Sequence, residues 1–424
     1  MLMPPNTVLP PRMSLVRQPF DSGEVIDLAG ILAAGLQVQL ARANLPVGAT
    51  VAIGVGSRGV SPVVEVVRTL VDELRRAGLQ PIVVPAMGSH GGGTAAGQEA
   101  VLTDYGVAEE TVGAPIRATM ETIELGRTPS GVIVHLDAAA ASTDGVIVIG
   151  RVKPHTGFRG PVESGLCKMT AVGLGNRHGA ESVHAHPLVT TIPEVAAVTV
   201  ASGRLLCGVA LVENAFDRPA CVEVVAPDDF RETDERLLLV AQQLLPRLPI
   251  KRLDGLIVDR MGKNISGSGM DPNVIGMWRR LSELERTPDY GWLAVLGLTP
   301  QSHGNAVGMG LADLCSRKLV DAIDYEAVAT NILTAMALDA AKTPLTLPND
   351  RICYETVMQL ASRTVDHDLR IGRIKNSLEL ETFWLSEAVL DDLPSNCVVV
   401  QPTAPFGFDP DGSVIEEGAF DLHG

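Results

Sequence analysis

Residues 50–86 have the sequence TVAIGVGSRGVSPVVEVVRTLVDELRRAGLQPIVVPA, and this stretch decides the fold. Its apolar run 50–55 predicts a strand, and Ser61 is a good N-cap for a helix that follows. Apolar residues then recur at three- and four-residue spacing until Gly78, as in an amphipathic helix, and residues 81–86 predict a second strand. A strand, a helix and a strand in this order favour a parallel sheet.

The same alternation continues along the chain in two series. Further strands are expected at 131–136, 145–150 and 207–212 with a helix at 230–245, and then strands at 255–259, 292–298 and 397–401 with helices at 306–316, 325–338 and 350–362. We therefore expect an α/β fold with two α/β domains and mostly parallel sheets. The Gly/Ser-rich segment 262–269 favours a boundary nearby, with an N-terminal domain over 1–255 and a C-terminal domain over 256–400. Residues 401–424 are expected to form a tail, which could pack back on the N-terminal domain.

Composition and charge exclude several classes of function. The 424 residues carry 34 Lys and Arg against 50 Asp and Glu, a net charge of −16, so binding to nucleic acid or to an anionic membrane is not expected. No apolar run reaches the roughly 18 residues of a transmembrane helix, and residues 1–17 lack the apolar core of a signal peptide. The six Cys are scattered without C-x-x-C spacing, which is typical of reduced thiols, so we expect a cytoplasmic protein.

Two glycine-rich segments follow predicted strands, which is where open α/β sheets bind ligands. In 54–59, GVGSRG, the glycines allow close approach of the backbone and Arg58 offers a bidentate fork for a carboxylate or phosphate, with a tight turn and a solvated Arg as the alternative. In 87–94, MGSHGGGT, backbone N–H groups before a helix favour an anion, and His90 is either a general base or ligand or a surface residue. Neither segment is a P-loop or a dinucleotide fingerprint, which argues against a nicotinamide dehydrogenase.

Reactive side chains are densest in 150–169, GRVKPHTGFRGPVESGLCKM, and in the nearby His178, His184 and His186. Lys168 follows Gly, Leu and Cys, and such an apolar setting would lower its pKa and favour its use as a nucleophile. The alternative is a lysine whose stem packs while its head reaches solvent. Each His by itself can be a satisfied polar contact, and the spacing matches no standard zinc pattern.

A fourth polar segment lies near the start of the second series. It spans 259–273, DRMGKNISGSGMDPN, and is joined by SHGN at 302–305. Because ligands often bind where domains meet, these residues could close over a cleft. Turn-forming roles for the Gly, Asp and Asn residues are the stronger alternative.

Taken together and in this order, these segments resemble the nickel-pincer lactate racemase family over most of the chain. The resemblance implies two α/β domains with an active-site cleft between them. It also implies a nickel-pincer nucleotide, a pyridinium mononucleotide with two sulfur-bearing arms, tethered through a thioamide to a lysine. Lys168 resembles that tether, and His184, 16 residues further on, resembles the nickel ligand. Ser57, in the position of the family's Thr-Arg-Pro loop, and Gly88 with Ser89, in the position of its Gly-x-His motif, are then expected to bind the cofactor.

The resemblance also implies catalytic and substrate-binding residues. His90 resembles the catalytic base of the Gly-x-His motif, and His155 resembles the second catalytic His, upstream of the tether. Arg58 resembles the Arg of the Thr-Arg-Pro loop, which contacts both cofactor and substrate. The family's second domain carries an Asp-x-Asn motif, which resembles Asp271-Pro-Asn273 here. Asn273 and the nearby Arg279 are therefore expected to contact the substrate, with Arg279 pairing with its carboxylate.

Several departures from the family pattern predict a substrate other than lactate. Lys168 lies in Gly-Leu-Cys-Lys, 13 residues after His155, a longer spacing than in lactate racemases, which have Gly-Gly-x-Lys. Val55 replaces an acidic residue before the loop Arg. Gly276 and Arg279 stand where lactate racemases have Gln and Lys, and Gly276 is expected to leave room for a larger substrate.

The expected activity is racemisation or epimerisation of a 2-hydroxy acid by proton-coupled hydride transfer. Such a reaction needs two bases that work near neutral pH, which suits His, and sulfur with one imidazole suits Ni(II). The alternative is a nucleotide- or metal-binding protein on the same scaffold without racemase activity, for example with zinc on His155, His184 and His186. Expected partners are the small-molecule substrate and, transiently, the enzymes of cofactor biosynthesis. The choice of His184 over His178 and His186 rests on spacing alone, and the sequence leaves the substrate and the oligomeric state open.

Overall fold

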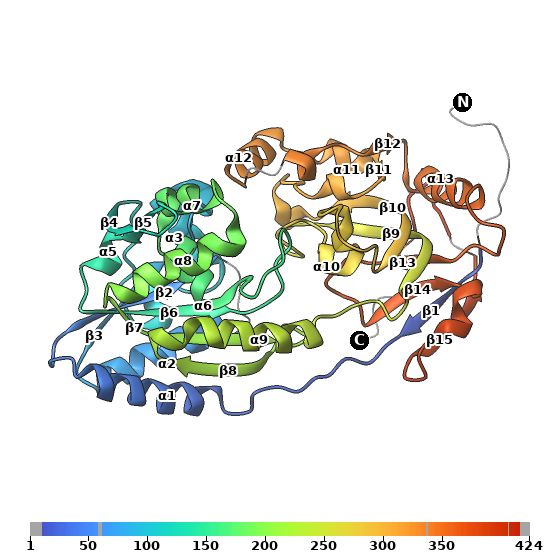
Figure 1. Ribbon diagram of the computed structural model, residues 1–424. Helices are drawn as coiled ribbons and strands as arrows, with labels where there is room; N and C mark the ends of the chain where they lie inside the picture. Colours follow the sequence, from blue (N-terminus) through green and yellow to red (C-terminus); the bar gives the residue numbers. More distant parts are fainter. Residues whose placement is uncertain (1–10, 58–61, 336–337, 406, 416–424) are drawn as a thin grey trace. The chain divides into compact units, whose positions relative to one another are not determined.

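The chain consists of two compact units, each built on its own sheet (Figure 1). The computed structural model describes residues 11–57, 62–335, 338–405 and 407–415. Asp21–Leu245 forms the N-terminal unit, and Met1–Phe20 together with Pro246–Gly424 forms the C-terminal unit. This division corrects the expected boundary at residue 255, and it assigns the start of the chain to the C-terminal unit.

The N-terminal unit contains a five-stranded sheet flanked by helices. In spatial order its strands are β3 (Gln80–Pro85), β2 (Thr50–Val55), β6 (Gly145–Arg151), β7 (Leu205–Glu213) and β8 (Pro219–Val225). The first four run parallel, and β8 is antiparallel to β7. Its helices are α1 (Leu28–Ala43), α2 (Val63–Arg76), α3 (Ala95–Asp104), α4 (Glu109–Val112), α5 (Ala138–Ala141), α6 (Gly165–Lys168), α7 (Asn176–His184), α8 (Leu188–Ala201) and α9 (Phe230–Leu244), and a hairpin joins β4 (Thr122–Arg127) to β5 (Ile133–Asp137).

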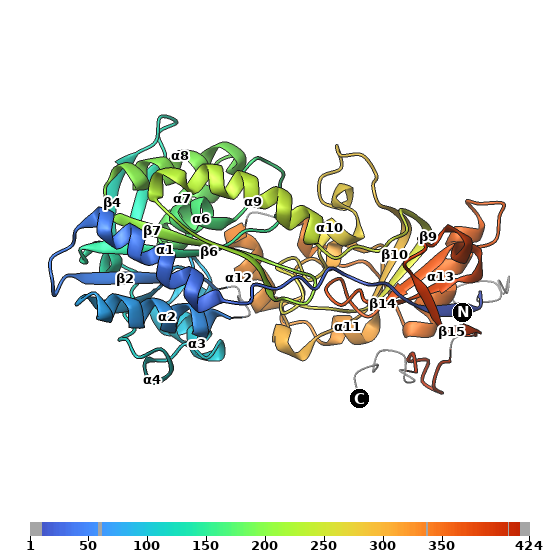
Figure 2. The same cartoon turned by 90° about the horizontal axis from the view of Figure 1, so that it is seen from below.

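Side chains alternate along the strands, so that both faces of this sheet are covered. In β2, Val51, Ile53 and Val55 pack in the core on the face of α1 and α2. Ala52 and Val84 belong to the core on the opposite face, where α6, α8 and α9 pack. Figures 1 and 2 show the two groups of helices on either side of the sheet. Strands buried on both faces are apolar without interruption, which is why the sequence predicts them well.

The C-terminal unit contains an eight-stranded mixed sheet. In spatial order its strands are β12 (Leu345–Leu347), β11 (Leu314–Ser316), β10 (Asp289–Leu298), β9 (Arg252–Met261), β13 (Ile371–Ile374), β14 (Thr382–Ser386), β1 (Met13–Arg17) and β15 (Val398–Ala404). The strands from β12 to β13 run parallel, and β14, β1 and β15 pair antiparallel. Its α-helices are α10 (Pro272–Ile275), α11 (Arg317–Asp321), α12 (Tyr325–Ala335) and α13 (Asp350–Ser362). The expected fold class, two α/β domains with mostly parallel sheets, is confirmed.

One segment of the second series differs from the sequence prediction. The helix expected over 306–316 is a single 3-10 turn, Met309–Leu311, followed by strand β11. Buried Met309, Leu311 and Leu314 explain the apolar signal, which does not by itself distinguish a helix from a turn followed by a short strand.

The described part of the C-terminal tail packs on its own unit. Within 407–415, the carbonyl oxygen of Asp411 accepts a hydrogen bond of 2.9 Å from the side-chain amide of Asn349. The rings of Phe408 and Tyr354 lie edge to face with centroids 5.8 Å apart. The described tail residues therefore contact α13 and the turn before it. In the part of the chain that the structure describes, no helix combines the length and apolar character needed to span a bilayer.

Candidate functional site

The carboxyl ends of β3, β2 and β6 place three of the four predicted polar segments along one edge of the N-terminal sheet. These strands are neighbours and run parallel, so the loops that follow them emerge at the same edge (Figure 1). The loop after β2 holds Ser57, the loop after β3 holds His90, and the loop after β6 holds His155. The fourth segment, 259–273, belongs to the C-terminal unit.

His90 is held by the neighbouring loop that follows β2. Its Nδ1 shares a hydrogen bond with Ser57 Oγ, and the hydroxyl of Tyr105 donates to the Ser57 carbonyl oxygen at 2.8 Å. The buried amide of Gln98 donates to the carbonyl of Gly88 at 2.9 Å, which fixes the start of the His90 loop. Arg58, predicted to bind cofactor and substrate, lies outside the described residues, so its role stays a prediction.

Gly88 joins the His90 loop to the segment that follows Lys168. Its N–H donates to the carbonyl oxygen of Gly173 at 3.0 Å, and its φ of +61° is a conformation that other residues rarely adopt. A Cβ at this position would lie 3.1 Å from the Val172 carbonyl oxygen. Glycine is therefore required here by close backbone packing. Ser89 beside it is half-buried.

His155 lies in a loop that is closed by one buried carboxylate. Glu163, only 2% exposed, accepts hydrogen bonds from the backbone N–H of His155 at 2.7 Å and of Gly160 at 3.1 Å, and from Arg159 at 3.2 Å. The N–H of Gly157 donates to His155 Nδ1 at 2.9 Å. Because Nδ1 accepts this bond, the neutral imidazole of His155 carries its proton on Nε2.

Lys168 is the last residue of α6, and the chain continues directly into a π-helical turn over Met169–Gly173. Such turns are rare and often occur at functional sites. Lys168 is half-buried, and its charge acts on the imidazole of His184. The charge of this predicted tether helps to lower the pKa of His184, the predicted nickel ligand.

His184 has the arrangement expected of a metal ligand. It ends α7, and its Nδ1 lies 2.7 Å from the carbonyl oxygen of Ala180. Nδ1–H donates to this oxygen, so Nε2 carries the lone pair that could bind a metal. Burial lowers the pKa of His184, the bond to Ala180 opposes that change, and the charge of Lys168 lowers the pKa further. The net lowering of the pKa favours the neutral imidazole that coordinates metals.

The two other His of this region are more exposed than His184, although His186 makes the same kind of contact to the carbonyl oxygen four residues earlier. His186 is exposed, with Nδ1 2.9 Å from the carbonyl oxygen of Ser182. His178 is exposed and its ring centroid lies 5.9 Å from that of His135, a half-buried residue that sequence reasoning did not single out. Among the described residues, no group of three or more His, Cys, Asp or Glu is placed to hold a metal ion, so zinc on three His side chains gains no support.

The geometry argues against the prediction that Arg279 pairs with a substrate carboxylate. Its side chain is 4% exposed, and its two terminal nitrogens donate to Asp313 at 3.0 Å and to the carbonyl oxygens of three residues at 2.7 to 3.1 Å, namely Tyr290, Gly291 and Leu311. These bonds tie the segment after β9 to β10 and its flanking loop. Arg279 is therefore held inside the C-terminal unit by its own fold.

Asn273 and Gly276 also serve the local structure around α10. The Asn273 side chain is buried and donates to Asp271 at 2.7 Å. Gly276 has a φ of +110°, and a Cβ there would lie 2.6 Å from Trp278 Nε1. The expectation that Gly276 leaves room for a larger substrate is therefore corrected, because this glycine is required by the turn and by the indole packed against it.

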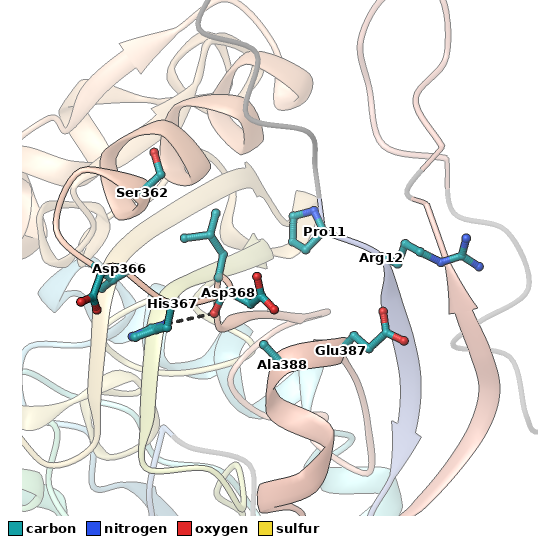
Figure 3. A pocket seen from close by; sticks show the side chains of 10 residues that line it. Pro11, Arg12, Ser362, Asp366, His367, Asp368, Glu387 and Ala388 are labelled. Atoms are coloured by element: carbon teal, nitrogen blue, oxygen red, sulfur yellow. Dashed lines mark hydrogen bonds between the residues drawn. The ribbon is translucent and has the colours of Figure 1, made fainter.

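Two cavities in the C-terminal unit hold none of the predicted site residues. The larger, of about 780 Å³, is lined among others by Arg12, Asp366, His367 and Glu387, as Figure 3 shows. The smaller, of about 350 Å³, adjoins the carboxyl ends of β9 and β10 and includes the buried ion pair Asp259–Arg373 and the half-exposed pair Lys318–Asp350. These cavities add no residue to the site of the N-terminal unit.

The fold and this edge define an α/β protein with His and Lys side chains on the loops of a parallel sheet, and comparison with known proteins finds a similar domain. Residues 49–189 match the family model of the lactate racemase N-terminal domain. These residues contain β2, the predicted catalytic His and the predicted tether. Residues 49–189 of the N-terminal unit are therefore similar to the N-terminal domain of lactate racemase.

Solved structures agree with this assignment at the level of fold. The lactate racemase apoprotein from Thermoanaerobacterium thermosaccharolyticum matches with a TM-score of 0.52 and 12% identity over 86% of this chain and 99% of that one. A Thermotoga maritima protein from the Northeast Structural Genomics Consortium matches with a TM-score of 0.50 and 14% identity over 76% of this chain and 84% of that one. No curated protein sequence matches.

Proposed function

We propose that this protein is a racemase or epimerase of a 2-hydroxy acid that works with a nickel-pincer nucleotide tethered to Lys168. The observation that carries the proposal is the hydrogen bond between His184 Nδ1 and the Ala180 carbonyl oxygen, which leaves Nε2 of this half-buried imidazole available to a metal, in the unit whose sheet edge presents His90 and His155. A family model that covers this edge adds support.

The donor set fits the cofactor. His184 offers Nε2 as a neutral imidazole ligand, and Lys168 offers an amine at the end of a helix, beside buried Cys167 and Leu166. The three consecutive glycines Gly91–Gly93, all with positive φ, precede α3 and expose backbone in a loop suited to a phosphate. When bound, the pincer nucleotide would supply the acceptor for the hydrogen on the substrate's 2-carbon.

His90 and His155 are proposed to handle the proton of the substrate hydroxyl. With His90 Nδ1 directed at Ser57 Oγ, His90 Nε2 is the atom that takes this proton. His155 Nδ1 accepts from the Gly157 N–H, so His155 Nε2 is the atom proposed to exchange a proton with the substrate oxygen in the second step. One group thus begins as base and the other as acid, and the reverse reaction exchanges their roles.

The substrate carboxylate needs a cation to bind it. Arg279 is not proposed for this role, because its terminal nitrogens donate to Asp313 and to the Tyr290 carbonyl oxygen. Arg58 is therefore the proposed partner, because a guanidinium binds a carboxylate through two parallel hydrogen bonds. The changed residues of the second-domain motif support a substrate other than lactate. The enzymes that build the cofactor are the proposed transient partners, and we propose that the protein works in the cytoplasm.

The test is co-expression with the pincer-synthesising enzymes, followed by intact mass, nickel content and peptide mapping. A nucleotide-sized adduct on Lys168 with stoichiometric nickel is expected, Lys168→Ala should lose it, and Lys251→Ala, an exposed lysine, should keep it. The loaded protein is then screened against 2-hydroxy acids. No adduct and no nickel, with a lactate racemase loaded in the same host, would contradict the proposal and favour the binding-protein alternative.

Turnover then tests the two catalytic assignments. His90→Ala and His155→Ala should each abolish racemisation and leave nickel content near that of the unmodified protein, because neither residue is proposed to bind the metal. Normal turnover by either variant would show that the assignment of two bases is wrong.

A further inference from the structure

A buried carboxylate from α9 holds the short helix that ends in Lys168. Asp234 is 1% exposed, and its two oxygens accept hydrogen bonds from the backbone N–H groups of Leu166 at 2.9 Å and Cys167 at 2.8 Å. In a helix of four residues, no N–H in the first turn has an acceptor within the helix. Asp234 supplies both missing acceptors from another element of the fold.

The neighbouring residues are shaped around this carboxylate. Gly165 opens the helix with a φ of +82°, and a Cβ there would lie 2.1 Å from Asp234 Oδ1. A Cβ on Gly208 of β7 would likewise lie 2.6 Å from the ring of Phe230 at the start of α9. Glycines at both points allow α6, α9 and β7 to pack closely enough for the two hydrogen bonds.

Burying a carboxylate is unfavourable unless its oxygens are hydrogen-bonded, and both oxygens of Asp234 are. Burial raises the pKa of Asp234 to about 7, and the bonds from Cys167 and Leu166 oppose the rise. Its hydrogen bonds are all directed at the residues just before Lys168. Asp234 therefore orients the residues that lead into Lys168.

We propose that Asp234 is a positioning residue for Lys168. By fixing the two N–H groups that precede it, Asp234 sets the direction of α6 and of the π-helical turn, and so holds the Lys168 amine at the carboxyl edge where it would be modified. The proposal rests on the proposed function in one respect only, namely that Lys168 is the tether.

The experiment compares Asp234→Asn with Glu235→Gln in full-length protein co-expressed with the pincer-synthesising enzymes. Glu235 is the next residue on α9, 38% exposed and paired with Arg231, so its variant matches the loss of charge without touching α6. The Asn side chain keeps one acceptor oxygen and turns a donor amide toward the second N–H. We expect the fraction of Lys168 carrying the adduct to fall about tenfold in the Asp234 variant and to be unchanged in the Glu235 variant.

A second readout needs no cofactor. In protein without cofactor, trace acetylation measures the reactivity of the Lys168 amine relative to that of the exposed Lys251. Hydrogen exchange measures the exchange rates of the Leu166 and Cys167 amides. Asp234→Asn should change the labelling ratio severalfold and speed exchange at these two amides about tenfold, with the amides in the middle of α9 unchanged. A purely structural role would lower the melting temperature and leave the labelling ratio of the folded protein as it was.

The outcomes separate the two proposals. Loading and labelling equal to the unmodified protein in Asp234→Asn would overturn the positioning role. If the unmodified protein itself carries no adduct, the proposed function fails, and the labelling ratio alone then supports or overturns the positioning role. If Asp234→Asn does not fold, Asp234→Ser, whose smaller hydroxyl still accepts one N–H, is judged by the same ratio.

Discussion

Glu163→Gln tests whether one buried carboxylate sets the position of His155. Glu163 accepts three hydrogen bonds, from the His155 N–H, the Gly160 N–H and Arg159, and its side chain is 1% exposed. Gln has the same shape but only one acceptor oxygen, so at least one donor faces the new amide NH₂. A hydrogen bond to a charged group contributes about 1.5 to 3 kcal/mol, and we expect a loss near the middle of that range, about 2 kcal/mol.

Thermal unfolding followed by calorimetry measures this loss. For a unit of this size, about 2 kcal/mol lowers the melting temperature by roughly 4 to 8 °C. Glu181→Gln is the control, because Glu181 is 48% exposed and pairs with Arg177 on the surface of α7, where a pair contributes about 0.3 to 0.5 kcal/mol. If protein loaded with cofactor is active, Glu163→Gln should also reduce turnover. Equal melting temperatures for the two variants would refute the reasoning, because they would show that the buried bonds contribute no more than a surface pair.

Three further changes should give measurable results. Arg373→Met leaves the buried carboxylate of Asp259 without its two bonds of 2.7 Å and should lower the free energy of unfolding by about 3 to 5 kcal/mol in urea titration. Gly308→Ala should lower the free energy of unfolding by about 3 kcal/mol, because the residue has a φ of +103° and its Cβ would lie 1.6 Å from the backbone oxygen of Ser268. The control is Gly131→Ala, which has a φ of +89° but no atom close to the new Cβ, and should lower it by about 1 kcal/mol. Burial holds the pKa of His184 below its ordinary value of 6.5, so as the pH falls the unfolded chain binds a proton at this imidazole before the folded protein does. The stability contributed by His184 is therefore complete above pH 6.5 and is lost as the pH falls below it. In urea titrations between about pH 7 and about pH 5, His184→Gln should reduce the decrease in the free energy of unfolding.

Local sequence carries much of the N-terminal unit. Strands β2, β3, β6 and β7 are buried on both faces, so each gives an apolar run, and the polar loops that follow mark the carboxyl edge. His90 and His155 were therefore placed at one edge without any distance information. Helix α13 was predicted with the bounds that the structure gives, since an N-cap Asn and helical spacing are both local signals.

Long-range pairing explains most of what the sequence did not predict. Strand β1 pairs with β14 and β15, nearly 400 residues away, and no local pattern indicates which edge of which sheet a short strand joins. Asp234 lies within an ordinary amphipathic helix, and only packing against α6 reveals its role. Arg279 has a motif position that suggests a ligand, yet the carbonyl groups around it come from segments that only the folded chain brings together.

The sequence by itself determined that this is an α/β protein, where the parallel strands of its N-terminal unit lie, and which loops carry His, Lys and Arg. These properties follow from hydrophobic periodicity and from turn residues, which act over a few positions along the chain. Only the tertiary structure decided which of those polar residues face one another and which make their hydrogen bonds within the folded chain. A hydrogen bond or a buried ion pair depends on distances of about 3 Å between residues far apart in sequence, and those distances are set by packing.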